Sequence, residues 1–200
     1  MPRRCRHLLE ETKKRMRKLL FSLSACGVLL SLTGCFFGGT TRETQVFDLA
    51  EKAKGAKPLP YDVHFLFFRN LSGSDRRFLL RQPGDRMVSD EFSRWLLDPE
   101  LMLERYLRDE VRGGGSASVR IRGVITRFEV DVERRAAVLA VDFVLRIDDR
   151  SAGVSCRAQK ALPAGGITPA GAAQAMSECA SAVAEELRKH ILAFAKGKLK

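Results

Sequence analysis

The clearest pattern in this 200-residue chain is a regular alternation of apolar and polar residues between positions 137 and 148. The apolar phase consists of Ala137, Leu139, Val141, Phe143, Leu145 and Ile147. The other phase carries charges at Asp142, Arg146 and Asp148. Successive side chains of a strand point to opposite faces, so this pattern predicts a strand with one buried face and one face in water.

A second strand is predicted before this one, between residues 118 and 132. Its first apolar residues, Val119 and Ile121, share one phase, whereas Phe128 and Val130 share the other. A single extra residue in a strand causes such a change of phase. We therefore expect a β-bulge at residues 125–127.

Shorter apolar runs predict further strands at residues 45–49, 63–68, 77–81, 86–88 and 154–158. A helical segment is predicted from Phe92, because Phe92, Trp95 and Leu96 share one face at 3.6 residues per turn. Asp98-Pro99 is typical of a fresh helix start, and the glycines at 113–115 would end that helix.

A long C-terminal helix is predicted with Thr168 as its N-cap and Pro169 at its first position. Its apolar stripe runs from Met176 to Phe194. The order of strands, helix, three strands and helix predicts an α+β fold. We expect a two-layer sandwich in which a mainly antiparallel sheet carries two principal helices on one face.

The basic residues gather at the N-terminus. Residues 1–34 hold eight basic and two acidic side chains, so they carry +6 of the formal net charge of +11 and leave +5 for the rest. This distribution does not indicate a nucleic-acid-binding protein. An apolar stretch follows at residues 19–30, too short to span a bilayer. A basic segment before a short apolar run is the layout of a secretory signal peptide.

The signal peptide ends in Leu32-Thr33-Gly34-Cys35, which resembles the bacterial lipobox. The resemblance implies that Leu32, Thr33 and Gly34 are recognised by the signal peptidase and that Cys35 receives a diacylglyceryl thioether. The predicted organisation is a signal peptide at 1–34, a lipidated tether at 35–43 and a single periplasmic domain at 44–200. Met16 begins a compact basic segment, so residues 1–15 are interpreted as an over-extended gene start.

The expected location is the cell envelope, with a lipid anchor in the outer membrane facing the periplasm. The residue after Cys35 is Phe36 and not the Asp that favours inner-membrane retention in enteric-type lipoproteins. Acyl chains on one cysteine hold a protein to a membrane because each buried CH₂ contributes about 0.8 kcal/mol.

The chain carries no familiar catalytic pattern. His64 and His190 are not spaced as a metal-binding pair, and no Cys-x-x-Cys is present. We therefore predict that the protein is not an enzyme, that it has no metal site, and that its only cofactor-like group is the covalent lipid on Cys35.

Two cysteines remain in the predicted domain, Cys156 and Cys179. Both lie on apolar faces, one of a strand and one of a helix. In an oxidising compartment they either form a disulfide or stay as two buried thiols, and the sequence leaves both alternatives open.

Trp95 is the only tryptophan. Its place on an apolar face fits packing in the core, and the alternative is a contact with a partner or with lipid. Arg81, at the end of a predicted strand, is a second candidate for contact with a partner.

Two motifs resemble the ABC-type transport auxiliary lipoprotein family. The first is the extended segment 77–81, which ends in Arg81, and the second is Phe92-Ser93-Arg94-Trp95, similar to that family's helix start. Apolar helix positions follow at Pro99, Met102, Leu103 and Leu107. Downstream, residues 125–129 and 138–147 are similar to the family's hairpin.

This resemblance implies a non-enzymatic accessory of an ABC/MCE-type intermembrane lipid transport system. The implied partners are an MCE-domain protein, the ABC transporter components and the membrane, with a homo-oligomer as a further expectation. The alternative is a lipopolysaccharide-assembly or secretin-pilot-type lipoprotein of outer-membrane biogenesis.

Overall fold

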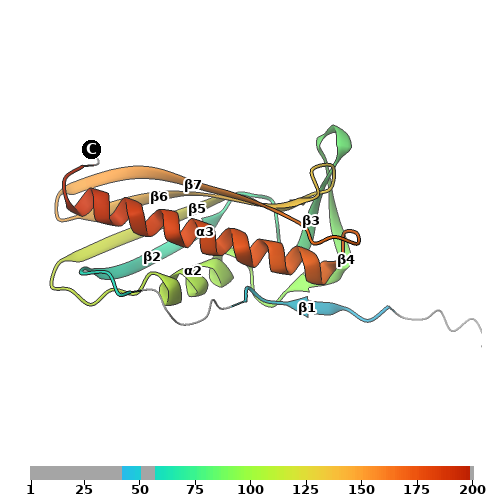
Figure 1. Ribbon diagram of the computed structural model, residues 1–200, viewed down its shortest axis with the longest axis horizontal. Coiled ribbons are helices and arrows are strands. Elements are labelled where there is room, and N and C mark those ends of the chain that lie inside the picture. Colours follow the sequence, from blue (N-terminus) through green and yellow to red (C-terminus); the bar gives the residue numbers. More distant parts are fainter. Residues whose placement is uncertain (1–41, 51–56, 199–200) are drawn as a thin grey trace, which may run out of the picture. The chain divides into compact units, whose positions relative to one another are not determined.

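Three long antiparallel strands form the centre of the sheet: β5 (Ser118–Asp131), β6 (Ala136–Ile147) and β7 (Arg150–Ala161). The computed structural model describes residues 42–50 and 57–198, and Figure 1 shows α3 lying along these strands. The apolar phase of β6 is buried at every position from Ala137 to Ile147. The predicted strand is therefore confirmed, but its second face is exposed only at Asp142, Val144 and Arg146 and is buried at Val138 and Ala140.

The predicted bulge in β5 is confirmed as well. The register of β5 against β6 shifts between Ile125 and Arg127. As a result Phe128 enters the core, with 1% of its surface exposed, and Glu129 lies on the opposite face.

Four shorter strands complete a seven-stranded sheet: β1 (Gln45–Phe47), β2 (Asp62–Asn70), β3 (Arg77–Gln82) and β4 (Arg86–Trp95). The order is β1-β4-β3-β5-β6-β7. On its second edge β5 pairs in parallel with β2 along its first half and with β3 near its end. The sheet is mixed, and its longest pairings are antiparallel.

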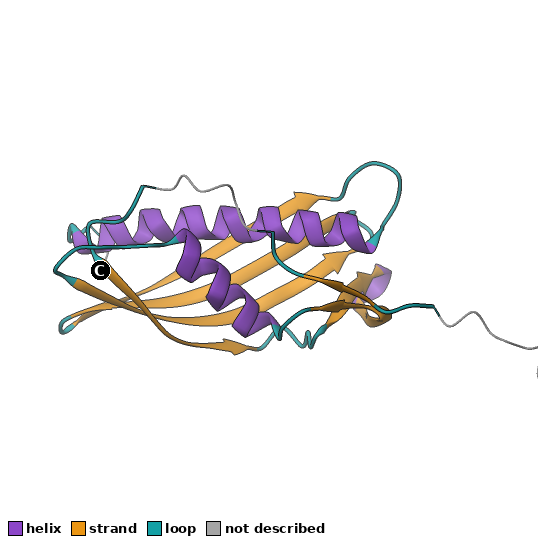
Figure 2. Cartoon of the chain, turned by 90° about the horizontal axis from the view of Figure 1, so that it is seen from below, coloured by secondary structure: helices purple, strands orange, loops and turns teal. Residues whose placement is uncertain are grey.

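The helices α2 (Pro99–Glu110) and α3 (Pro169–Ala195) lie on the same face of the sheet (Figure 2). The Thr168 hydroxyl accepts a hydrogen bond from the Gly171 amide at 3.1 Å, which caps α3 as predicted. The α+β two-layer sandwich is thus confirmed. No helix in the described ranges is both long and apolar enough to cross a membrane.

The glycines after α2 have a role beyond ending the helix. The Leu59 amide donates to the Arg112 carbonyl at 2.8 Å, so the chain around residue 60 passes directly beside the glycines. A Cβ atom at Gly113 would lie 1.8 Å from the Tyr61 carbonyl oxygen. Only glycine permits this close approach of two backbones.

The helix predicted from Phe92 is wrong, because residues 86–95 form strand β4. Ser93 and Trp95 are each 2% exposed and Arg94 between them is exposed, which is the alternation of a strand. The register between β3 and β4 shifts between Arg77 and Leu79. This irregularity breaks the period of two and leaves apolar residues three apart, a spacing that imitates a helix.

Candidate functional site

The face of the sheet opposite the helices carries exposed side chains from four strands. We call this surface the open face. It consists of His64, Phe67 and Arg69 of β2, Arg120 and Arg122 of β5, Asp142, Val144 and Arg146 of β6, and Ser151, Gly153 and Ser155 of β7.

One row of the open face joins an aromatic ring, a cation and an aliphatic side chain. Phe67 pairs with Arg122, and Arg122 pairs with Val144 on the next strand. The Arg122 guanidinium carbon lies 5.2 Å from the centre of the Phe67 ring, a cation–π contact. Phe67 is 46% exposed and Val144 is 48% exposed. This row therefore offers apolar surface to a partner.

The adjacent row places two like charges directly opposite each other. Arg120 is paired with Arg146 across β5 and β6, and with His64 across β2 and β5. Nε of Arg146 donates to the Asp148 carbonyl at 3.1 Å. The Arg120 guanidinium makes no hydrogen bond or ion pair with any residue that the structure describes. Like charges opposite each other destabilise a sheet, so an acidic group placed between them would be favourable.

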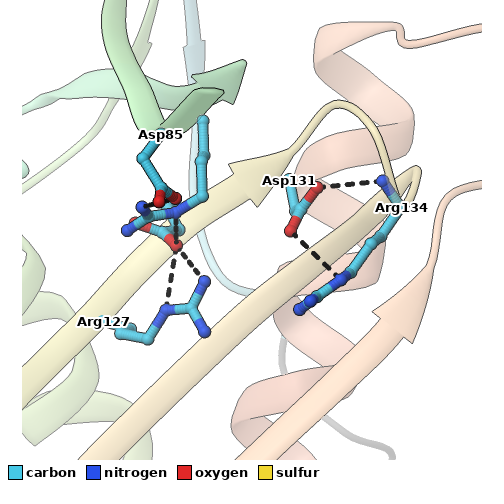
Figure 3. A network of polar contacts seen from close by, with 6 residues as sticks. Asp85, Arg127, Asp131 and Arg134 are labelled. Carbon is cyan, nitrogen blue, oxygen red and sulfur yellow. Dashed lines mark hydrogen bonds and ion pairs between the residues drawn. The ribbon is translucent and has the colours of Figure 1, made fainter. Parts of the chain in front are cut away.

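A separate polar cluster lies where β3 meets the end of β5 (Figure 3). Arg81 donates to both carboxylate oxygens of Glu129, at 2.8 Å from Nε and 3.1 Å from Nη2, and it also donates to Asp85 at 2.8 Å. Nε of Arg127 lies 2.9 Å from Glu129 Oε1. Next to them, the Arg134 amide donates to Asp131 at 2.9 Å.

The cluster is built around a buried carboxylate. Only 2% of the Glu129 surface is exposed. Burial opposes its ionisation, but the hydrogen bonds from Arg81 and Arg127 outweigh burial and hold the pKa of Glu129 below its ordinary value. The same bond with Glu129 raises the pKa of Arg81 above the usual arginine range. The cluster therefore holds the β3–β4 hairpin to β5 as a set of satisfied charge pairs.

The two residues predicted to contact a partner, Arg81 and Trp95, lie in different surroundings. The guanidinium of Arg81 is held by Glu129 and Asp85, with 27% of the side chain exposed. Trp95 is 2% exposed, stacks on Phe78 with ring centres 4.1 Å apart, and meets the Phe128 ring at 5.2 Å. Trp95 is therefore a core residue, and the prediction that it contacts a partner is wrong.

Cys156 and Cys179 are both buried free thiols. Cys179 Sγ lies 3.4 Å from the Ala137 carbonyl, at a level of the sheet where Ala137 pairs with Lys160. Cys156 lies four residues from Lys160 along β7, a separation of roughly 13 Å. The disulfide alternative is therefore wrong. Burial is the main cause that raises the pKa of each thiol to about 12.

The predicted lipid site lies outside the described residues, as do Leu32, Thr33, Gly34 and Cys35. Arg120 and Arg122 lie in the strand predicted at residues 118–132, and both side chains are exposed. The sequence did not predict that Phe67 and Val144 belong to the open face. For Val144 the pattern contained an indication, because it is an apolar residue in the polar phase of β6.

His64, one of the two histidines in the predicted domain, lies on the sheet surface and not in the core. It lies on the open face, with Nε2 at 2.9 Å from Asp62 Oδ2, and the side chains of both residues are about half exposed. His64 is thus a surface residue of an edge strand with an acidic neighbour.

The fold and the open face define a two-layer α+β domain in which residues 42–50 and 57–198 leave one sheet surface exposed. No family model matches the chain, and no curated protein matches it. Several solved structures share its fold. One is the crystal structure of an uncharacterized protein, with 9% identity and a TM-score of 0.62 over 74% of this chain and 99% of that one. Another is a protein of Xanthomonas campestris described under the family designation DUF330, with 14% identity and a TM-score of 0.59 over 77% of this chain and 98% of that one.

These comparisons correct the family assignment. The named neighbour carries the designation DUF330 and not that of the ABC-type transport auxiliary lipoproteins, and no family model supports the latter. The motif Phe92-Ser93-Arg94-Trp95 also ends a strand, whereas the resemblance required it to start a helix. At these identities the solved structures show the fold alone.

Proposed function

We propose that this protein is a lipid-anchored, non-enzymatic accessory of an ABC/MCE-type intermembrane lipid transport system in the cell envelope. The anchor is proposed from the order of basic segment, apolar run and Leu32-Thr33-Gly34-Cys35 in the sequence. The domain docks through its open face onto an acidic surface of the MCE-domain protein or of its transporter.

The observation that carries the docking proposal is the Arg120–Arg146 pair. Two arginines lie opposite each other with Arg122 beside them, and the exposed Phe67 and Val144 adjoin them. Arginine and aromatic side chains are enriched in the centres of protein interfaces. Complementary acidic groups on the partner would remove the repulsion between the two arginines and would speed the encounter.

The non-enzymatic role is supported by the state of the nucleophiles and bases. Cys156 and Cys179 are buried, and the pKa of each is raised to about 12, so neither is a ready nucleophile. His64 has an aspartate beside it, both side chains are about half exposed, and the pair adjoins the arginine row. This arrangement suits recognition better than bond-making.

The tether sets how far the domain reaches from the membrane. Nine residues lie between Cys35 and the start of β1 at Gln45, so ten peptide units join the two. Covalent geometry limits such a segment to about 35 Å. A lipid on Cys35 therefore keeps the open face within reach of partners near one membrane.

The experiment measures binding of the purified full chain to the purified MCE-domain protein of the same organism. We expect saturable binding, weakened at least about tenfold in the double variant Arg120→Glu/Arg146→Glu. The matched control is Arg86→Glu, an exposed arginine at the start of β4 and away from the open face, which should bind like wild type.

Three results would contradict the proposal. They are no binding, equal binding by the double variant and wild type, or binding only to an outer-membrane β-barrel or a secretin. Binding to phosphatidylglycerol vesicles that is lost in the double variant, with no binding to the protein partner, would assign the open face to lipid instead. A homo-oligomer remains a separate prediction, tested by the mass of the purified protein in solution.

A further inference from the structure

Three side chains with metal-ligating atoms converge between β7 and α3, on the face of the sheet opposite the open face. The sulfur of Cys156, a carboxylate oxygen of Glu186 and a ring nitrogen of His190 all lie within 4.8 Å of one another. Glu186 and His190 are four residues apart on α3 and therefore share one face of the helix. Nε2 of His190 lies 3.8 Å from Oε1 of Glu186.

The three groups form a donor set that suits zinc. Thiolate, imidazole and carboxylate are the usual protein ligands of Zn²⁺, with bonds of about 2.3 Å to sulfur and about 2.1 Å to nitrogen or oxygen. Neighbouring donors around a tetrahedral ion are then roughly 3.5 Å apart. The distance from His190 Nε2 to Glu186 Oε1 is 3.8 Å, close to that value, and no separation among the three atoms exceeds 4.8 Å. The Glu186 and His190 side chains are 42% and 30% exposed, so they are free to turn toward the sulfur.

Cys156 differs from Cys179 in a way that points to a ligand. The Cys179 thiol donates to the Ala137 carbonyl. Cys156 is also 0% exposed, yet its thiol has no hydrogen-bond partner among the residues that the structure describes. Burial, and then the nearby charges of Glu186 and Asp142, raise the pKa of Cys156 to about 12. A divalent cation between Cys156, Glu186 and His190 would stabilise the thiolate and offset the negative charge of Glu186.

We propose that Cys156, Glu186 and His190 bind one Zn²⁺ ion, with water in the fourth position. On binding, the thiol loses its proton to solvent and the imidazole coordinates through an unprotonated ring nitrogen. The ion joins the middle of β7 to the C-terminal half of α3, so it acts as a structural clamp between the two layers. This site is independent of the open face and of the proposed docking function.

The sequence gives little warning of this site. Glu186-x-x-x-His190 supplies only two ligands, and the third comes from a strand that the fold brings against the helix. Acidic and histidine side chains four residues apart are common on exposed helix faces. The nearby thiol of Cys156 is what distinguishes this pair from an ordinary surface pair.

The experiment uses the full chain, purified without a polyhistidine tag and treated with a chelator, and Co²⁺ as the probe. We expect one Co²⁺ per chain, with a thiolate-to-cobalt charge-transfer band in the near ultraviolet and visible bands of a four-coordinate ion. Addition of Zn²⁺ should abolish these bands and raise the melting temperature. The affinity for Co²⁺ should fall at least about 100-fold in Cys156→Ser, and the charge-transfer band should disappear.

Cys179→Ser is the matched control, because it removes a buried thiol from the same interface without touching the site. It should keep the cobalt bands and the rise in melting temperature. His190→Gln, at a partly exposed position, should fold normally and lose tight binding, which keeps the test decisive if Cys156→Ser does not fold. Absence of the charge-transfer band in wild type, or its persistence in both Cys156→Ser and His190→Gln, would overturn the proposal.

Discussion

Arg81 and Glu129 are joined by two hydrogen bonds, of 2.8 Å and 3.1 Å, although they are 48 residues apart in the chain. The pair connects β3 to β5 at the point where the two strands meet in parallel, with Leu80 opposite Val130. A second arginine, Arg127, binds the same carboxylate from the strand position two residues away. Glu129 is thus the centre of the contact between the β3–β4 hairpin and the rest of the sheet.

Replacing the buried carboxylate should destabilise the fold. Glu129→Gln leaves two guanidinium groups sharing a neutral partner, and we expect a loss of about 2 kcal/mol in the free energy of unfolding. The loss stays below that of a wholly buried pair because Arg81 and Arg127 are partly exposed. Urea denaturation measures the difference. Asp85→Asn is the control, since the Asp85 side chain is 87% exposed and should contribute less than about 0.5 kcal/mol.

The same residue predicts how stability depends on pH. The pKa of Glu129 is lowered in the folded protein, so its ionised form stabilises the fold at pH values above the unfolded value of about 4.3. That contribution is lost as the pH falls through the folded pKa. Below about pH 4.3 we expect wild type to lose up to about 1.4 kcal/mol per pH unit more than Glu129→Gln. Parallel curves for the two proteins between pH 5 and pH 3 would contradict this explanation.

Two strand glycines should respond oppositely to the same substitution. A Cβ atom at Gly123 would lie 2.5 Å from Cε1 of Phe68, whose ring packs in the core, so Gly123→Ala should cost about 1–3 kcal/mol. Gly153 on β7 has open space at the Cβ position. Gly153→Ala should leave the melting temperature unchanged or raise it slightly. A neutral Gly123→Ala would show that the Phe68 ring moves aside freely.

Trp95 should behave as a core residue. Its ring lies between Phe78 and Phe128, so Trp95→Ala should cost about 3–5 kcal/mol, and Trp95→Phe should cost less. Leu96→Ala, at the next position but 42% exposed, should have little effect. Because Trp95 is the only tryptophan, its fluorescence reports directly on its surroundings. Emission typical of a water-exposed indole in the native protein would contradict this placement.

The sequence predicted the local structure best where one face of an element is buried along its whole length. The alternation in β6, the bulge near Ile125 and the Thr168 cap each depend on neighbouring residues, and each was confirmed. The strand at Phe92 was mistaken for a helix because its irregular pairing with β3 hides the period of two.

The candidate site was harder to predict, because it depends on which strands become neighbours. Arg120 and Arg122 lie in a predicted strand, but nothing in the local pattern places Phe67 of β2 beside Arg122. The burial of Glu129 also depends on which strands become neighbours. An outward-facing strand residue is ordinarily exposed, and only the approach of Arg81 from β3 covers it.

The most direct test of the proposed function is photocrosslinking in the living cell. A photoreactive amino acid at position 144, on the open face, should crosslink to an MCE-domain protein or to a component of its ABC transporter. The same amino acid at position 101, which is 53% exposed on α2 on the helix side, should give no such product. Crosslinks to these proteins from position 101 and not from 144, or crosslinks from 144 only to a β-barrel or a secretin, would contradict the account.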